Sequence, residues 1–296
     1  MINKEKISIE ELEKMRLEVK KISFYKSLII TPIIIILIIM FFLGSNTISL
    51  ISIVGLILAT IVAALYNSKN VTKYRVMYKE NFVKLVLQEE LENLIYKPYE
   101  GIQKEILTNT GMIYTFSKYY ANDYISAEYK GVKIKQSNVH ILKKVETNKR
   151  TSYVTMFRGN WTICEFNKNF RSKLQIYEKG FAGARNNGLF SNDFKKIELE
   201  DSEFNDKFVV YAENEQEAFY IITPQFMNKI KRLNNNISGK MMLCFYNNRV
   251  YIGLNNGRDS FEPNINKKID KEEIRKDIKL ITAFIDELDI EVKLFK

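Results

Sequence analysis

The sequence has 296 residues, with 45 Lys and Arg against 35 Asp and Glu and a net charge of +10. Its single histidine and two cysteines argue against a zinc site and a disulfide framework, and no cofactor is expected. The basic excess suits a domain held near an anionic membrane leaflet, which is a simpler explanation than nucleic-acid binding.

Residues 1–26 predict a cytoplasmic amphipathic helix. Ser8 and Glu11 have the spacing of a capping box, and an apolar stripe follows it, made of Leu12, Met15, Val19 and Ile22. Such a helix lies on lipid headgroups or against a folded domain, and a docking surface for a partner is the alternative.

Residues 27–66 contain two apolar runs, 27–44 and 48–66, and neither run has an Asp, Glu, Lys, Arg or His. As helices that rise about 1.5 Å per residue, both runs match the ~30 Å hydrocarbon layer of a bilayer. The connection between them has room only for a tight turn. We therefore expect a transmembrane helical hairpin embedded in the lipid bilayer.

Basic residues predict the orientation of this hairpin, because lysine and arginine resist translocation and flank both ends, whereas the turn has none. Both termini are then cytoplasmic, and the chain is a multi-pass protein of a bacterial plasma membrane, the inner membrane of the cell. A cleaved signal peptide is disfavoured, since a second apolar run follows at once.

Small residues recur every fourth position along the second run, at Gly55, Ala59 and Ala63. Such a stripe lets another helix backbone approach closely, which predicts an interaction or packing seam. The first run of the same chain is the favoured occupant, and a homodimer is the alternative. Because neither run has an ionisable residue, the sequence indicates no ion or proton pathway.

Residues 67–97 predict a helical stalk that ends near Lys97 and Pro98, because the residue before a proline disfavours helix. The apolar face of this stalk is wider than a coiled-coil seam. Packing against its own domain is therefore favoured over a coiled-coil dimer.

Residues 98–296 predict a cytoplasmic α+β domain with a mainly antiparallel β-sheet and a few helices. Short alternating runs rich in Tyr, Val, Ile and Phe indicate strands, including one over 204–213 and one near the carboxyl end. Expected turns or breaks are Gly131, Gly159–Asn160, 167–169 and a two-residue hairpin turn at Asn247–Asn248. The glycine-rich run 178–190 favours a surface loop over a phosphate cradle.

Several motifs resemble a bacterial family catalogued as domain of unknown function 3137. They are the run 203–211, then Glu217-Ala218 and Thr223-Pro224-Gln225-Phe226-Met227 and, earlier, 122–126, 129–132, 157–159 and 166–168. The resemblance covers nearly the whole chain, including the two apolar runs. It implies a membrane-anchored cytoplasmic domain, and it supplies no catalytic residues.

The side chains that could carry chemistry form no recognised catalytic or metal-binding motif. His140 lies in a strand-like run and favours a histidine with one hydrogen bond. Acid-base pairs would need carboxylates such as Asp123, Glu128, Glu198 and Glu200. Nucleotide stacking would need the tyrosines 114, 119, 120, 124 and 129.

The sequence therefore favours a non-enzymatic function. We expect an uncharacterised integral membrane protein whose cytoplasmic domain binds or scaffolds an unidentified protein partner, with no catalytic, cofactor-binding or metal-binding residues. A membrane-proximal enzyme of unspecified reaction is the alternative, and nucleic-acid binding ranks below it.

Overall fold

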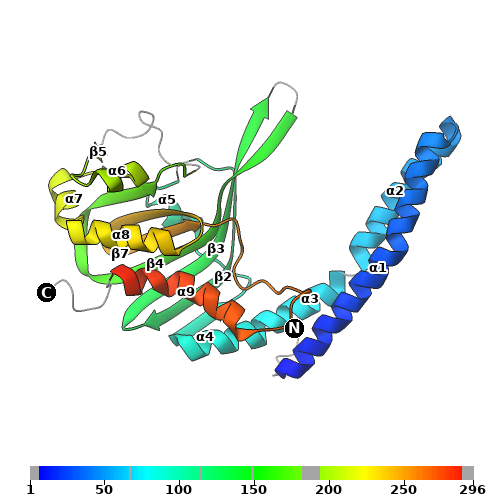
Figure 1. Ribbon diagram of the computed structural model, residues 1–296, viewed down its shortest axis with the longest axis horizontal. Coiled ribbons are helices and arrows are strands. Elements are labelled where there is room, and N and C mark those ends of the chain that lie inside the picture. Colours follow the sequence, from blue (N-terminus) through cyan, green and yellow to red (C-terminus); the bar gives the residue numbers. More distant parts are fainter. Residues whose placement is uncertain (1–6, 67, 114, 148–149, 182–193, 289–296) are drawn as a thin grey trace. The chain divides into compact units, whose positions relative to one another are not determined.

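The computed structural model describes most of the chain (Figure 1), namely residues 7–66, 68–113, 115–147, 150–181 and 194–288. The chain forms two compact units, each described here by itself. The first unit comprises Met1–Leu85 and Glu262–Lys271, and the second comprises Val86–Phe261 and Glu272–Lys296.

The first unit begins with helix α1, Ile9–Leu43, which joins the predicted amphipathic helix and the first apolar run in one element of 35 residues. Ser8 caps it as expected: its hydroxyl accepts from Glu11 N, and the Glu11 carboxylate accepts from Ser8 N. Pro32 lies inside this helix, and its missing N–H removes one helical hydrogen bond there.

Helix α2, Asn46–Tyr66, packs alongside α1. Ser49 Oγ donates to Phe41 O over 2.9 Å, and a Cβ built on Gly55 would lie 3.0 Å from the Leu37 side chain. By length and composition, α1 is the one helix among the described residues that could cross a membrane, and a shorter apolar stretch spans Asn46–Ala59.

The segment Glu262–Lys271 returns to the first unit from the carboxyl-terminal half of the chain. The buried guanidinium of Arg16 donates to Ile265 O over 2.6 Å and pairs with Glu13 at 2.7 Å. The Glu13 carboxylate also accepts from Ile269 N at 3.3 Å. This polar clamp ties the segment to the first turns of α1.

The predicted stalk is not one helix. Its residues form helix α3, π-helix η1, helix α4 and strand β1, at Ser68–Met77, Tyr78–Val83, Lys84–Glu90 and Glu92–Lys97. The helix ends earlier than expected. Asn93 adopts a φ of 51°, and Tyr96, in strand β1, donates a hydrogen bond to the buried Asp123. That pairing outweighs the local helical pattern.

The second unit is organised around a seven-stranded sheet in the order β1-β2-β3-β4-β6-β5, with β7 paired to β4. All its neighbouring strands run antiparallel, which confirms the predicted α+β class with a large antiparallel sheet. The remaining strands are β2 Lys118–Tyr129, β3 Val132–Thr147, β4 Arg150–Glu178, β5 Lys195–Ile197, β6 Phe208–Ala212 and β7 Lys240–Asn255.

Three predicted breaks are absent, because β4 and β7 are long continuous strands: β4 runs through Gly159–Asn160 and 167–169, and β7 runs through Asn247–Asn248. Gly159 lies within β4 rather than at a turn. A Cβ at this position would lie 2.1 Å from Leu254 O, so only glycine lets the β4 and β7 backbones approach this closely. The predicted hairpin turn at Asn247–Asn248 is wrong: Asn247, with φ 53°, sits opposite Phe170 where the β4–β7 register shifts. Positive φ serves a bulge here rather than a turn.

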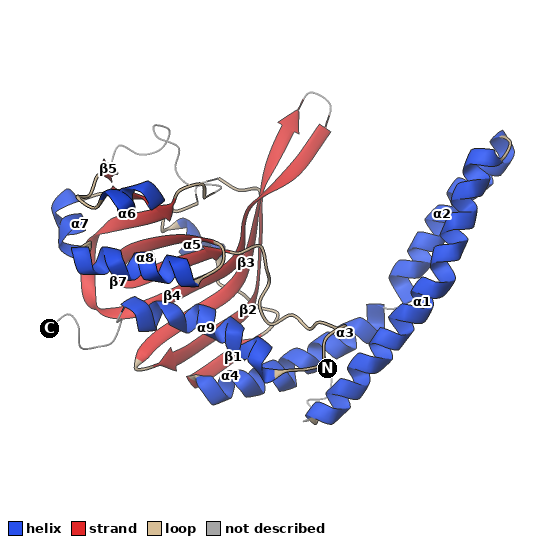
Figure 2. Ribbon diagram, viewed as in Figure 1, coloured by secondary structure: helices blue, strands red, loops and turns tan. Residues whose placement is uncertain are grey.

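Helices α6 to α9 cover one face of the sheet, and α5 lies on the other (Figure 2). Under α5 lies a buried core that includes Ile141, Phe157 and Trp161. The bounds are α5 Lys104–Thr108, α6 Ser202–Lys207, α7 Glu215–Ile221, α8 Pro224–Asn236 and α9 Lys271–Leu288.

Local caps position these helices. Thr223 accepts from Phe226 N at the start of α8, and Asn214 accepts from Glu217 N at the start of α7, as expected. Asp201 accepts from Phe204 N and starts α6, so the strand predicted over 204–213 begins only at Phe208. The strand predicted near the carboxyl end lies outside the described residues.

Candidate functional site

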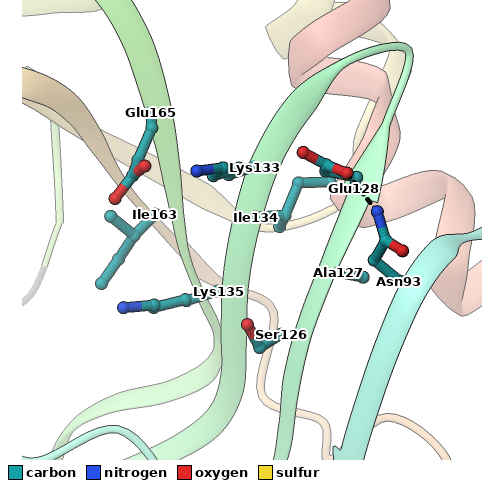
Figure 3. Close-up of a pocket in the computed structure, with 9 residues that line it drawn as sticks. All are labelled: Asn93, Ser126, Ala127, Glu128, Lys133, Ile134, Lys135, Ile163 and Glu165. Atoms are coloured by element: carbon teal, nitrogen blue, oxygen red, sulfur yellow. Dashed lines mark hydrogen bonds between the residues drawn. The ribbon is translucent and has the colours of Figure 1, made fainter.

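A groove opens on the sheet face that carries α5, beyond the part of that face covered by the buried core (Figure 3). Its volume is about 390 Å³, and strands β1 to β4 build it. The lining residues are Asn93, Ser126, Ala127, Glu128, Lys133, Ile134, Lys135, Ile163 and Glu165.

Strand register explains the charge pattern of this groove. Antiparallel pairing sets Glu128 of β2 opposite Lys133 of β3, and it sets Glu165 of β4 opposite Arg249 of β7. Paired residues point to the same face, so acidic and basic side chains alternate across the sheet. Lys135 lies between Ser126 of β2 and the buried Ile163 of β4.

Both carboxylates of the groove are engaged, whereas its lysines are not. Glu128 accepts a short hydrogen bond from Asn93 Nδ2, and Glu165 pairs with Arg249 at 3.1 Å. Within the described part of the chain, the exposed Lys133 and Lys135 make no ion pair. The groove can therefore offer two ammonium groups to a partner.

The groove lining combines two carboxylates, two lysines and the hydroxyl of Ser126. Its lining includes no histidine or cysteine, and no group of residues within the described ranges has the composition and geometry to hold a metal ion. Ser126 lies opposite Lys135 across the β2–β3 pair, and the two carboxylates are engaged by Asn93 and Arg249.

The predicted carboxylates do not converge. Asp123 is fully buried in β2, Glu128 lines the groove, and Glu198 pairs with Lys196 of the opposite edge strand β5. Glu200 follows it in the same segment. An acid-base pair from this set has no structural basis.

Asp123 instead belongs to a buried polar network that sequence reasoning missed. Tyr96 Oη donates to Asp123 over 2.6 Å, and Asn138 Nδ2 donates to it over 3.0 Å. Asn160 Nδ2 donates to Asn138 Oδ1 and to Ser260 Oγ, at 3.2 and 3.0 Å. The network joins β1, β2, β3 and β4 to the loop after β7, so its role is structural.

His140 and the cysteines occupy structural positions. His140 Nε2 lies 3.2 Å from Thr155 Oγ1 of the neighbouring strand, and Tyr120 packs beside the ring. Cys164 and Cys244 are fully buried, and burial raises the pKa of the Cys164 thiol to about 12. Thiols in this state are poor nucleophiles.

The predicted tyrosine cluster does not form one stacking surface. Tyr119 donates to Ile102 O over 2.6 Å, Tyr129 donates to Asp286 of α9, and Tyr120 is exposed. Tyr114 lies outside the described residues. These tyrosines serve different contacts, which weakens the nucleotide-stacking interpretation.

The seam residues and the glycine-rich run are described only in part. Gly55 faces Leu37 of α1, Ala59 is half-buried, and the side chain of Ala63 lies outside the described part. In the run 178–190, the described residues reach Phe181, which is buried.

The groove could have been anticipated only in fragments. Alternation in β3 places Lys133 and Lys135 on one face, which the sequence shows. Asn93, Glu165 and Arg249 come from strands whose register no local pattern specifies. The pairing of distant strands thus decides the composition of the site.

Comparison with known proteins gives a family match for part of the chain. Residues 155–290 match the model described as "Protein of unknown function (DUF3137)". The search of curated proteins found no match. A crystal structure of the mycobacterial trehalose monomycolate transport factor A, TtfA, aligns at 9% identity with a TM-score of 0.39, covering 70% of this chain and 93% of that chain. So remote a similarity transfers no function, and the part of the chain that matches the family of unknown function runs from within β4 to beyond α9.

Proposed function

We propose that this protein is an integral membrane protein in which α1 and α2 anchor a cytoplasmic binding or scaffold domain. The apolar surface of the helix pair carries the proposal. Large apolar side chains there are open to the surroundings, with exposed fractions of 76% for Phe42, 83% for Leu43 and 66% for Leu50. Such a surface is unfavourable in water and favourable in hydrocarbon.

Orientation follows from the basic residues on both flanks. Lys20 and Lys21 precede the first apolar run, Lys69 and Lys73 follow the second, and the turn at Ser45 has none. The proposed topology has two spans and both termini in the cytoplasm of a bacterial cell.

The groove is the proposed partner-binding surface. Its ammonium groups at Lys133 and Lys135 suit a protein segment with acidic side chains. A second copy of the chain, joined through the seam of α2, is an alternative partner.

Site-specific photo-crosslinking tests the binding role. A photoreactive residue replaces Lys135 in the groove or, as a matched control, the exposed Lys279 of α9. Cells that express the chain natively are irradiated, and the membrane fraction is isolated. We expect a discrete adduct from the groove position only, and its loss on Lys133→Glu substitution in the same chain.

Two outcomes contradict the proposal. Recovery of the full chain in the supernatant after ultracentrifugation without detergent would contradict the proposed membrane anchor. Equal adducts from both positions, or none from the groove position, would show that the groove is not the binding surface.

A further inference from the structure

Lysines gather where the apolar helices give way to polar sequence. Lys20, Lys21 and Lys26 lie at this border on α1, and Lys69 and Lys73 lie on α3. Between Glu18 and Glu80 the sequence has no Asp or Glu. The border therefore has an excess of positive charge, and Glu18 of α1 is the nearest carboxylate in the sequence.

Contacts within the first unit place Lys20 and Lys21 of α1 near the height of Lys69 of α3. Ser49 contacts Phe41, Gly55 contacts Leu37, and farther along the unit Tyr74 interacts with Arg16. Residues earlier in α1 thus lie beside residues later in α2 and α3, because the chain reverses direction after α1. We call these five residues the lysine belt: Lys20, Lys21, Lys26, Lys69 and Lys73.

The belt differs from the other basic residues near it. Arg16 is paired with Glu13, and Arg75 with Glu262 at 3.2 Å, whereas the belt lysines make no ion pair with described residues. Among them project Phe24 and Tyr25, with exposed fractions of 64% and 51%. Aromatic rings beside ammonium groups are typical of the headgroup level of a membrane.

We propose that the lysine belt binds the phosphate groups of anionic phospholipids, so that the chain selects phosphatidylglycerol over zwitterionic phosphatidylcholine. The inference rests on the proposed two-helix anchor, which brings the belt to headgroup level. Ammonium groups attract an anionic leaflet, and the attraction weakens with salt because mobile ions screen it. Each lysine near the surface adds up to about fivefold in affinity.

Electron spin resonance of the full chain in phosphatidylcholine vesicles tests the selection. Spin-labelled phosphatidylglycerol and phosphatidylcholine serve as probes, and the motionally restricted fraction of each gives their relative affinity. We expect a preference of roughly threefold or more for phosphatidylglycerol. It should approach unity in a variant with Lys20, Lys21, Lys69 and Lys73 all changed to Gln.

Matched variants complete the test. Changing Lys133, Lys135, Lys143 and Lys144 to Gln removes the same charge from the sheet and should leave the preference intact. Changing Lys20, Lys21, Lys69 and Lys73 to Arg should also retain it. The proposal that the lysine belt binds anionic lipids is wrong if the wild type has equal affinity for both probes. It is also wrong if both Gln variants lose the preference equally. If neither probe is restricted, the proposed anchor itself fails.

Discussion

Asp123 shows how one side chain fixes a junction of the sheet. It is fully buried with a φ of 55°, and Tyr96 and Asn138 donate to its carboxylate. Asn138 Nδ2 also donates to Ser260 O over 2.9 Å, so one amide group links the carboxylate to the loop after β7. Removal of that amide leaves buried acceptors without their donor.

We expect Asn138→Ala to lower the free energy of unfolding by about 2 to 4 kcal/mol, since unsatisfied buried polar groups are costly. Unfolding of the full chain in detergent can be followed by the fluorescence of Trp161, the single tryptophan. Asn248→Ala, at an exposed position of β7, is the control and should change stability by less than about 0.5 kcal/mol. Equal losses in both variants would contradict a structural role for the network.

Asp277 of α9 gives the second unit a predictable pH response. Burial raises the pKa of Asp277 above its usual value, although hydrogen bonds from Phe261 N and Arg258 oppose the rise. Between the usual value, near 4, and the raised one, the folded state keeps a proton that the unfolded state has lost. Its contribution to stability therefore falls as pH rises through that window.

Asp277→Asn should abolish this contribution. The free energy of unfolding of the wild type, relative to the variant, is expected to decrease as pH is raised from about 4. Carboxylates with a lowered pKa, such as Glu217, cancel in the difference because both proteins have them. A difference that stays constant or grows with pH would show that burial does not govern this group.

Among the contacts between elements, the clamp between α1 and the segment Glu262–Lys271 contains a buried ion pair. Substitutions there can distinguish the loss of one partner from the loss of the buried charge itself. Glu13→Ala would leave the buried guanidinium of Arg16 without its carboxylate, whereas Arg16→Met removes the charge itself. Breaking a buried pair by removing one partner costs about 3 kcal/mol, and an apolar replacement costs less. Glu13→Ala should therefore be the more damaging change.

Hydrogen exchange of the full chain in detergent measures this effect. Protection of the amides in Glu262–Lys271 should fall by about a hundredfold in Glu13→Ala and less in Arg16→Met. The exposed Glu18 lies on the same helix, and Glu18→Ala should leave the protection unchanged. Greater exchange in Arg16→Met than in Glu13→Ala would contradict the charge argument.

Elements governed by local chemistry were predictable. The caps at Ser8, Asn214 and Thr223 start their helices as expected, because each hydroxyl or amide acts within three residues. Elements governed by distant pairing were not. Glu92–Lys97 has a helical pattern, yet it pairs with β2.

The same distinction applies to glycine and asparagine. Gly159 has the appearance of a break and instead admits the β7 backbone. The tolerance of Asn247 for positive φ was predictable, but its use in a bulge depends on Phe170 of β4. The groove and the buried network share this property, because their residues meet only when four or more strands have paired.

At the scale of the whole molecule, the buried thiols make the membrane topology measurable. Cys164 and Cys244 are the only cysteines, both are fully buried, and burial raises the pKa of both thiols. A maleimide that cannot cross membranes reacts with thiolates, so the wild-type chain should label slowly. New cysteines at exposed positions then report their own compartment.

We expect Asn46→Cys, in the turn region, to label in intact spheroplasts, because two spans place it outside. Lys14→Cys and Lys69→Cys should label only after the membrane is permeabilised, since both flanks are then cytoplasmic. If α1 alone crosses the membrane, Lys69→Cys shares the compartment of Asn46→Cys and labels in intact spheroplasts as well. Lys69→Cys therefore decides between one span and two, and with it the side of the membrane on which the sheet and its groove meet their partner.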